Sequence, residues 1–375
     1  MSSKIDIKKI DKNFSSHLSN DISYRWINPL NVSDISVYGF NWFQKDRRYH
    51  RFPQDSDKRM EKLDGSVGVL ANNSSGGMLA FWGSIQSLKI RVKLSYMFNM
   101  GHMAYTGQAG FDLYMGENFD SLKFYRTANF NFNYNHYEFT FFDRNEALNQ
   151  LFVLNFPLYA SVEEILVGVN EDAEVKKVEN LFPNEGKIVF YGTSITQGGC
   201  ASRPGMSYTQ IISRHLGYEC LNFGFSGNGK GHIEVAQILS TIENVKMFIL
   251  DYEANVEFTR LKSTLKPFVA WDEFEQIKEP ESKRVFITDP ALATAGSILK
   301  TLEHMKKYGF KDENVVIMAM FGCQSGIERI FKEHPEVKLF LVHMADGIRE
   351  DGYLLPYNGD TGDRLYGVRE NEYVI

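Results

Sequence analysis

A serine follows a short apolar run in the stretch VFYGTSITQGGCASRPG, which spans Val189 to Gly205. Ser194 comes three residues after Tyr191, and Gly198 and Gly199 lie a few residues further on. A serine hydroxyl at the mouth of a parallel sheet is placed to act as a nucleophile, and small neighbours leave backbone N–H groups open toward a developing oxyanion. The alternative is a polar residue in an ordinary turn.

Two further segments end in residues that fit the same chemistry. NFGFSGNGKG contains Gly227 in a loop rich in small residues, and LDYEAN delivers Asn255 as a side-chain amide donor. In a doubly wound sheet the carboxyl ends of successive parallel strands share one edge, so Ser194, Gly227 and Asn255 are expected to meet there. One serine and two hydrogen-bond donors at three strand ends together predict an active site.

A second stretch, VFITDPALATAGS from Val285 to Ser297, carries different chemistry. It reads as an apolar strand, an acidic residue at its end, and small residues and hydroxyls that open a helix. Backbone N–H groups at a helix N-terminus bind phosphate, and Thr294 and Ser297 add hydroxyl donors. Asp289 is suited to ribose hydroxyls or to a Mg²⁺ shell. The alternative is a loop that only caps its helix.

The elements that position these residues fall into two kinds. From about residue 22 to 170, short runs of aromatic and β-branched residues between Gly, Asn and Asp turns predict an antiparallel sheet, interpreted as a β-sandwich. Its aromatic residues are interpreted as core, with a sugar-binding face as the alternative. From Lys187 a strand–turn–helix rhythm predicts a doubly wound, mostly parallel sheet of the flavodoxin/Rossmann kind. The fold class is therefore α/β with an N-terminal all-β domain.

The chain divides into an N-terminal tail (1–19), a β-sandwich domain (20–178), one α/β part (187–258) and a second α/β part (259–375). We expect the two α/β parts to share one composite sheet, because each would otherwise leave a strand edge and helix faces uncovered. The alternative is two halves that pack poorly. The expected strands are 188–191, 221–223, 246–251, 285–288, 315–319 and 339–342.

Composition argues against several classes of function. The net charge of −6 argues against a general nucleic-acid or acidic-membrane binder. The 3 cysteines have no metal-type or CxxC spacing, so free thiols in a reducing compartment are expected. No secretory signal and no membrane-spanning run is found, and we expect a cytoplasmic protein that contacts neither nucleic acid nor membrane. Oligomeric state is left open.

Residues 20–258 resemble an SGNH (GDSL-type) hydrolase with its β-rich N-terminal domain. GTSITQGGCASRPG, NFGFSGNGKG and DYEAN resemble three blocks of that family, and GFDLYM and RYHRFP resemble signatures of the N-terminal domain. The resemblance implies that Ser194 is the nucleophile, that its N–H, the Gly227 N–H and the Asn255 side chain form the oxyanion hole, and that no cofactor or metal is needed. The implied substrates are O-acyl esters, often on carbohydrate.

The sequence departs from this family at the general base. The family places it in a D-x-x-H block, and that pattern is absent after Asn255. Of the later histidines, His304 and His334 are expected to face solvent. His343 follows a strand and is expected at the same edge as Ser194, either as a recruited base or as a structural turn residue. A missing triad member costs orders of magnitude in rate, so an impaired esterase is expected.

Residues 260–368 resemble the C-terminal half of uracil phosphoribosyltransferase. DPALATAGS is similar to that family's DPMLATGGS loop, RLKSTLKP to its R-x-x-x-T-L-x-P, and GYLLPYNGDTGDRLYG to its closing segment. The resemblance implies a phosphoribosyl pyrophosphate site formed by Arg260, Asp289, Pro290, Ala291, Leu292, Ala293, Thr294, Ala295, Gly296, Ser297 and Asp360. It implies a uracil site formed by Leu354, Gly359, Asp360 and Thr361, with Mg²⁺ as the candidate cofactor if the site is functional.

This second resemblance also departs from its pattern. Ala295 replaces a loop glycine, Tyr357 adds bulk near the nucleobase, and the family's first half is absent. The sequence therefore favours a Ser194-centred ester hydrolase that acts on a small-molecule or carbohydrate ester. The alternatives are phosphoribosyltransferase-like activity or binding of phosphoribosyl pyrophosphate or UMP, and a non-enzymatic binding scaffold.

Overall fold

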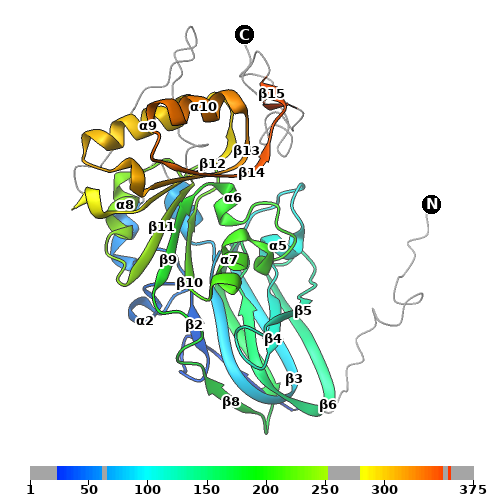
Figure 1. Cartoon of the computed structure of the whole chain (residues 1–375). Coiled ribbons are helices and arrows are strands. Elements are labelled where there is room, and N and C mark those ends of the chain that lie inside the picture. The colour runs from blue at the N-terminus through cyan, green and yellow to red at the C-terminus, as the bar shows by residue number, and fades with distance from the viewer. Residues whose placement is uncertain (1–22, 61–65, 252–278, 349–353, 356–375) are drawn as a thin grey trace.

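The computed structural model describes residues 23–60, 66–251, 279–348 and 354–355. Figure 1 shows an antiparallel β domain below a parallel sheet that is flanked by helices. This arrangement confirms the fold class expected from the sequence. All three cysteines, Cys200, Cys220 and Cys323, carry free thiols. Among the described residues, no helix combines the length and the apolar character needed to cross a bilayer.

The strands of the β domain form one hydrogen-bonded antiparallel sheet. Its strand order is β1-β7-β3-β6-β4-β5. Outside this order, β2 and β8 also pair with β3. The strands are β1 Tyr24–Ile27, β2 Ser36–Tyr38, β3 Met78–Met97, β4 Asp112–Gly116, β5 Lys123–Thr127, β6 His136–Asn155, β7 Ala160–Asn170 and β8 Glu174–Lys177. Short helices decorate it: α2 Phe43–Asp46, η2 Gln54–Ser56, α3 Asp57–Met60, α4 Ser66–Ala71 and α5 Tyr105–Ala109.

The two longest strands let this single sheet enclose a core. The β3–β6 register shifts between Ile85 and Ser87 and again between Leu88 and Lys89, and such bulges bend a strand and increase its twist. Side chains from both ends of β3, from Leu79 to Leu94, therefore join one buried cluster. Aromatic residues of this domain fill that cluster, in line with their interpretation as core.

The parallel sheet contains six strands in the order β10-β9-β11-β12-β13-β14. They are β9 Lys187–Gly192, β10 Glu219–Gly224, β11 Val245–Asp251, β12 Val285–Leu292, β13 Val315–Gly322 and β14 Lys338–Met344. This is the flavodoxin-like order with one further strand. The composite sheet expected from the sequence is therefore present, and the two α/β parts share it.

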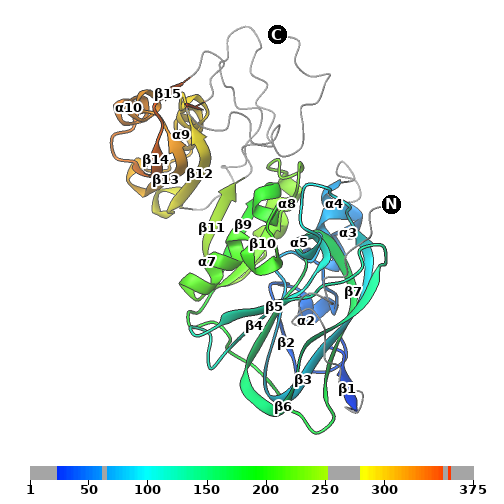
Figure 2. The same cartoon turned by 90° about the vertical axis from the view of Figure 1, so that its right-hand side faces the viewer.

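Helices cover the two faces of this sheet unequally. They are α6 Ser194–Gln197, α7 Tyr208–Leu216, α8 Ile233–Leu239, α9 Gly296–Lys307 and α10 Gln324–Glu333, with the 3₁₀ turns η3 Pro204–Met206, η6 Pro280–Ser282 and η7 Asp312–Asn314. α7 packs with β9 and β10 in one cluster, and α8 packs in another on the opposite face. α9 and α10 lie together over β12–β14 (Figures 1 and 2). A short hairpin of β15 Gly347–Ile348 and β16 Leu354–Leu355 completes the described chain.

The join between the two α/β parts is narrow. β11 pairs with β9 along its whole length, whereas its parallel ladder with β12 is confined to Leu250 opposite Ile287. The Thr288 hydroxyl adds a hydrogen bond to the Leu250 carbonyl, at 2.9 Å. β12 then pairs fully with β13. The hydrogen-bonded sheet is thus continuous, and its weakest ladder is the one between β11 and β12.

A buried arginine fixes the β domain to the end of β10. The Arg51 guanidinium donates to the carbonyls of Asn222 at 3.3 Å and Gly224 at 2.5 Å, and also to that of Leu70. It lies 4.6 Å above the Phe225 ring and is 1 % exposed. Burial lowers the pKa of Arg51, because a desolvated cation without a carboxylate partner is costly. Three buried carbonyls thus accept hydrogen bonds from this one side chain.

We predict that Arg51→Met will lower the free energy of unfolding by about 3 kcal/mol, because it leaves buried carbonyl groups without donors. The control is Lys93→Met, which removes an exposed ion pair with Glu163 and should cost less than about 1 kcal/mol. Urea denaturation of both variants measures the difference. Equal stability of the two variants would contradict the role given to Arg51.

Candidate active site

Ser194 is the first residue of α6, immediately after β9. Thr193 is the N-cap, and its hydroxyl accepts the Ile195 N–H at 3.3 Å. A Cβ at Gly192 would lie 2.2 Å from the Thr196 hydroxyl oxygen, so the turn from strand to helix requires glycine there. Ser194 is half-buried. Since β9 lies between β10 and β11 in the sheet, Ser194 sits at the topological switch point, where ligands of such sheets bind.

The loop after β10 lies directly against the loop after β9. The Phe225 N–H donates to the Gly192 carbonyl at 2.9 Å, and a Cβ at Gly229 would lie 2.0 Å from the same oxygen. Gly227 is exposed, has φ +66°, and no atom lies within 4 Å of a Cβ built on it. The structure therefore brings the Gly227 loop to the same edge as Ser194. Asn255 lies outside the described residues.

Gln197 connects α6, the helix that carries Ser194, to the loop after β10 and to the β domain. Its side-chain oxygen accepts the Ser226 N–H at 3.0 Å, and its Nε2 donates to Asn73 at 3.1 Å and to the Leu158 carbonyl at 3.2 Å. The side chain is fully buried. The residue before Gly227 and two segments of the β domain are thus held to α6. Sequence reasoning missed this residue, because its partners lie far away along the chain.

A buried carboxyl supports α6 from the other side. Asp251, at the end of β11, accepts a hydrogen bond from the Thr196 hydroxyl at 2.8 Å, and Thr196 also contacts the Tyr208 hydroxyl at 2.9 Å. Burial, together with the nearby carboxyl of Asp289, raises the pKa of Asp251 to about 6. Asp251 is the last residue of β11, and Asp289 lies within the adjacent strand β12 of the second α/β part. Sequence reasoning assigned no role to Asp251.

The loop after α6 is held by another buried carboxyl. Asp112 accepts the Gly205 N–H and the Asn155 amide, both at 2.8 Å, and the Arg203 guanidinium lies 3.7 Å away. Burial raises the pKa of Asp112 to about 6. The β domain thus fixes the chain after Ser194 at two points, Gln197 at the end of α6 and Gly205 in the following loop.

The structure does not bring His343 to Ser194. His343 is at the carboxyl end of β14, which lies four strands from β9 in the sheet order. At about 4.8 Å per strand the two ends are separated by about 19 Å, well beyond proton-transfer distance. Within the described residues, no hydrogen bond joins the Ser194 hydroxyl to a histidine. His334 is not solvent-facing: it is 5 % exposed, and its Nδ1 lies 3.0 Å from Asp312.

The second candidate site lies at the start of α9. Asp289, Pro290, Ala291 and Leu292 continue β12 instead of entering the loop, so the loop before α9 is limited to residues 293–295. Two side chains donate hydrogen bonds to carbonyls of this loop. The Cys323 thiol donates to the Ala293 carbonyl at 3.0 Å, and the Arg329 guanidinium donates to the Thr294 carbonyl at 2.5 Å. Its carbonyls are therefore directed toward α10.

The remaining residues of the expected phosphoribosyl and uracil sites are only partly described. Gly296 and Ser297 form the first turn of α9, and Leu354 is buried in a small cluster with Ala293 and Cys323. Asp289 accepts the Ala291 N–H at 2.9 Å, and burial raises its pKa. Residues Arg260, Gly359, Asp360 and Thr361 lie outside the described residues. Leu354 and Ala293 are the two members that the structure places together.

Family models match three successive parts of the chain. Residues 24–175 match GxDLY, the N-terminus of SGNH-hydrolase-type esterases, and residues 185–310 match the GDSL-like lipase/acylhydrolase family. Residues 254–368 match uracil phosphoribosyltransferase. These matches confirm both resemblances drawn from the motifs. The last two overlap across β12 and α9, the region in which the two α/β parts join.

Curated relatives match the C-terminal part. The uracil phosphoribosyltransferase of Bacillus pumilus is 33 % identical over 115 residues, which are 31 % of this chain and 53 % of that protein. The enzyme of the same name from Chlamydia muridarum is 42 % identical over 84 residues, 22 % of this chain and 27 % of that protein. The chain thus spans about half the length, or less, of these relatives.

Solved structures match most of the chain in fold. A protein from Bacteroides ovatus described as a GDSL-like lipase superimposes with a TM-score of 0.61 at 23 % identity, covering 86 % of this chain and 88 % of its own. A salicylyl-acyltransferase from a tetracycline biosynthetic pathway gives a TM-score of 0.53 at 12 % identity, covering 92 % and 94 %. At these identities the likeness establishes the fold alone.

We predict that Ala295→Gly will stabilise the protein by about 1 kcal/mol, because a non-glycine residue in the left-handed region is strained. Ala295 has φ +57° and is buried at the N-cap of α9, where the resembling family has glycine. Ala291→Gly is the control: it lies exposed in β12 and should lose stability instead. Thermal unfolding measures both changes, and a loss of stability in Ala295→Gly would refute the strain.

Proposed function

We propose that the chain is a serine ester hydrolase of the SGNH/GDSL type centred on Ser194. It acts on O-acyl esters of small molecules or carbohydrates, at a rate reduced by the missing D-x-x-H block. The observation that carries this proposal is the placement of Ser194: it begins α6 at the switch point of the sheet, against the open Gly227 loop. The GDSL-like match over residues 185–310 supports it.

The site assigns each step of ester cleavage to a group. The Ser194 hydroxyl oxygen attacks the ester carbonyl, and the oxyanion is held by the N–H groups of Ser194 and Gly227. In the described residues, neither N–H donates a hydrogen bond within the protein. The resemblance adds the Asn255 side chain as a third donor. Loss of the alcohol leaves an acyl-Ser194 ester, which water then hydrolyses.

Proton removal limits this reaction. Without a histidine on the Ser194 hydroxyl, solvent must take its proton. Enzymes stripped of a triad member retain about 10³–10⁴-fold catalysis over water from the oxyanion hole and binding alone. We therefore propose a slow hydrolase in which positioning by Gln197 and Asp112 preserves the oxyanion site although the base is lost.

The direct test is covalent labelling of the full chain with a fluorophosphonate probe. We predict slow labelling that disappears in Ser194→Ala and persists in Ser202→Ala, which removes an exposed serine hydroxyl of the neighbouring loop. Slow release of p-nitrophenol from its acetate ester should follow the same pattern. Equal labelling of both variants, or no labelling of the folded protein, would contradict the proposal.

A second candidate function rests on the loop before α9. We propose, as the alternative, that it binds the phosphate of phosphoribosyl pyrophosphate or UMP through the N-terminal N–H groups of α9. Asp289 is the carboxyl that would face the ligand's Mg²⁺; in the described residues no group of three acidic, His or Cys side chains could hold a metal alone. These ligands would then raise the unfolding temperature without labelling of Ser194. If the protein shows neither labelling of Ser194 nor a raised unfolding temperature, a non-enzymatic scaffold is favoured.

A further inference from the structure

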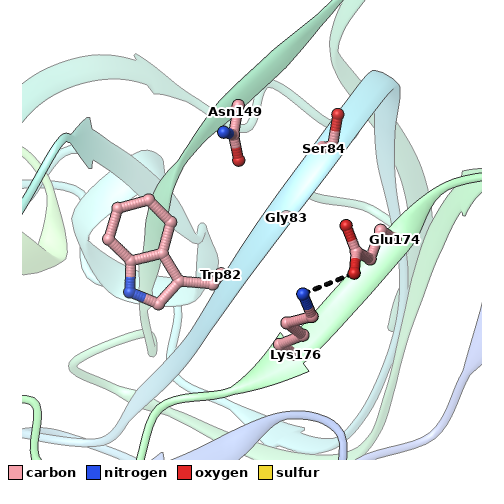
Figure 3. A pocket seen from close by; sticks show the side chains of 6 residues that line it. All are labelled: Trp82, Gly83, Ser84, Asn149, Glu174 and Lys176. Carbon is pink, nitrogen blue, oxygen red and sulfur yellow. Dashed lines mark ion pairs between the residues drawn. The ribbon is translucent and has the colours of Figure 1, made fainter.

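A groove lies on the antiparallel sheet, and none of its lining residues belongs to the Ser194 site or to the loop before α9. Its volume is about 320 Å³, within the range of small-molecule sites. It is lined by Trp82, Gly83, Ser84, Asn149, Glu174 and Lys176 (Figure 3). These residues come from β3, β6 and β8, and Figure 3 shows the indole ring on one side of Gly83 and the Glu174–Lys176 pair on the other.

Strand register explains why the sheet is hollow here. Ser84 of β3 stands opposite Asn149 of β6 and Glu174 of β8, which makes one row of side chains across the face. Trp82 lies opposite Leu151 and Lys176 in the next row. Two residues along a strand separate these rows by about 7 Å. Because the small Ser84 occupies the middle of its row, a hollow remains between the indole and the polar groups.

The chemistry of the groove suits a neutral ligand rich in hydroxyl groups. The Trp82 ring is half-buried against Met78 and Leu151, which fixes its orientation and leaves an apolar surface beside the hollow. Glu174 and Lys176 form an ion pair at 2.5 Å, so their charges offset each other and favour neither an anion nor a cation. Asn149 and Ser84 supply an amide and a hydroxyl that can both donate and accept.

We propose that this groove binds one pyranose ring of a neutral polysaccharide. The C–H face of the sugar stacks on the Trp82 indole, and its hydroxyls reach the Asn149, Ser84 and Glu174 row about 7 Å away. The strands hold all of these side chains in place before binding, so little ordering is needed. The site is independent of Ser194, and it would hold the protein on the same class of polymer whose esters the proposed hydrolase cleaves.

The test is calorimetric titration of the full chain with three neutral probes, cellohexaose, xylohexaose and chitohexaose, and with hexagalacturonic acid as the anionic comparison. We expect one of the neutral oligosaccharides to bind with a Kd between about 0.1 and 1 mM, as is usual for a single open subsite, and the anionic one to bind more weakly. Trp82→Ala should weaken binding at least tenfold.

Trp26→Ala is the matched control, because Trp26 lies in the same sheet but faces Arg91 instead of the groove. Should Trp82→Ala fail to fold, Ser84→Phe serves in its place: it fills the middle of the polar row on a solvent-facing surface and should abolish binding. Three outcomes would overturn the proposal: no neutral probe binds at millimolar concentration, the groove variants bind as well as Trp26→Ala, or hexagalacturonic acid binds as tightly as the best neutral probe.

Discussion

The rest of the structure depends on the parallel pairing of β11 with β9 on one side and with β12 on the other. Parallel sheets are found with both faces covered, and each α/β part contributes three strands to the one sheet that the helices cover. β11 supplies the shared edge, although its ladder to β12 is confined to Leu250 and Ile287. The two buried carboxyls, Asp251 and Asp289, lie at this join, and each has a raised pKa.

This join also explains why Ser194 keeps its place at the carboxyl edge of the sheet while His343 does not reach it. Ser194 depends on β9, α6 and the Gly227 loop, all of which precede the join and are held by the β domain through Gln197, Asp112 and Arg51. After the join the chain continues as β12 to β14, which place His343 four strands away. The Ser194 site and the loop before α9 thus share one edge of the sheet without sharing a reacting centre.

Local pattern was sufficient to predict the strands of the parallel sheet, their common sheet and the location of Ser194 at its carboxyl edge. It was not sufficient where a contact spans the chain. Gln197, Arg51 and Asp251 are polar residues whose partners lie in other segments, so no local periodicity marks them. The strand expected at 285–288 extends to Leu292, because pairing with β13 includes Asp289 and resumes at Ala291 after Pro290. The bulges of β3, which bend the sheet around its core, leave no signal in an alternating pattern.

The central claim is that the two α/β parts form one cooperative sheet. Hydrogen exchange of the full chain in a urea series, followed by mass spectrometry of peptides from β9 and β13, tests it most directly. If the sheet is one unit, the amides of β9 and β13 will lose protection together, at the same urea concentration. If the β13 peptides lose protection at lower urea while β9 remains protected, the two parts fold independently and the shared sheet is refuted.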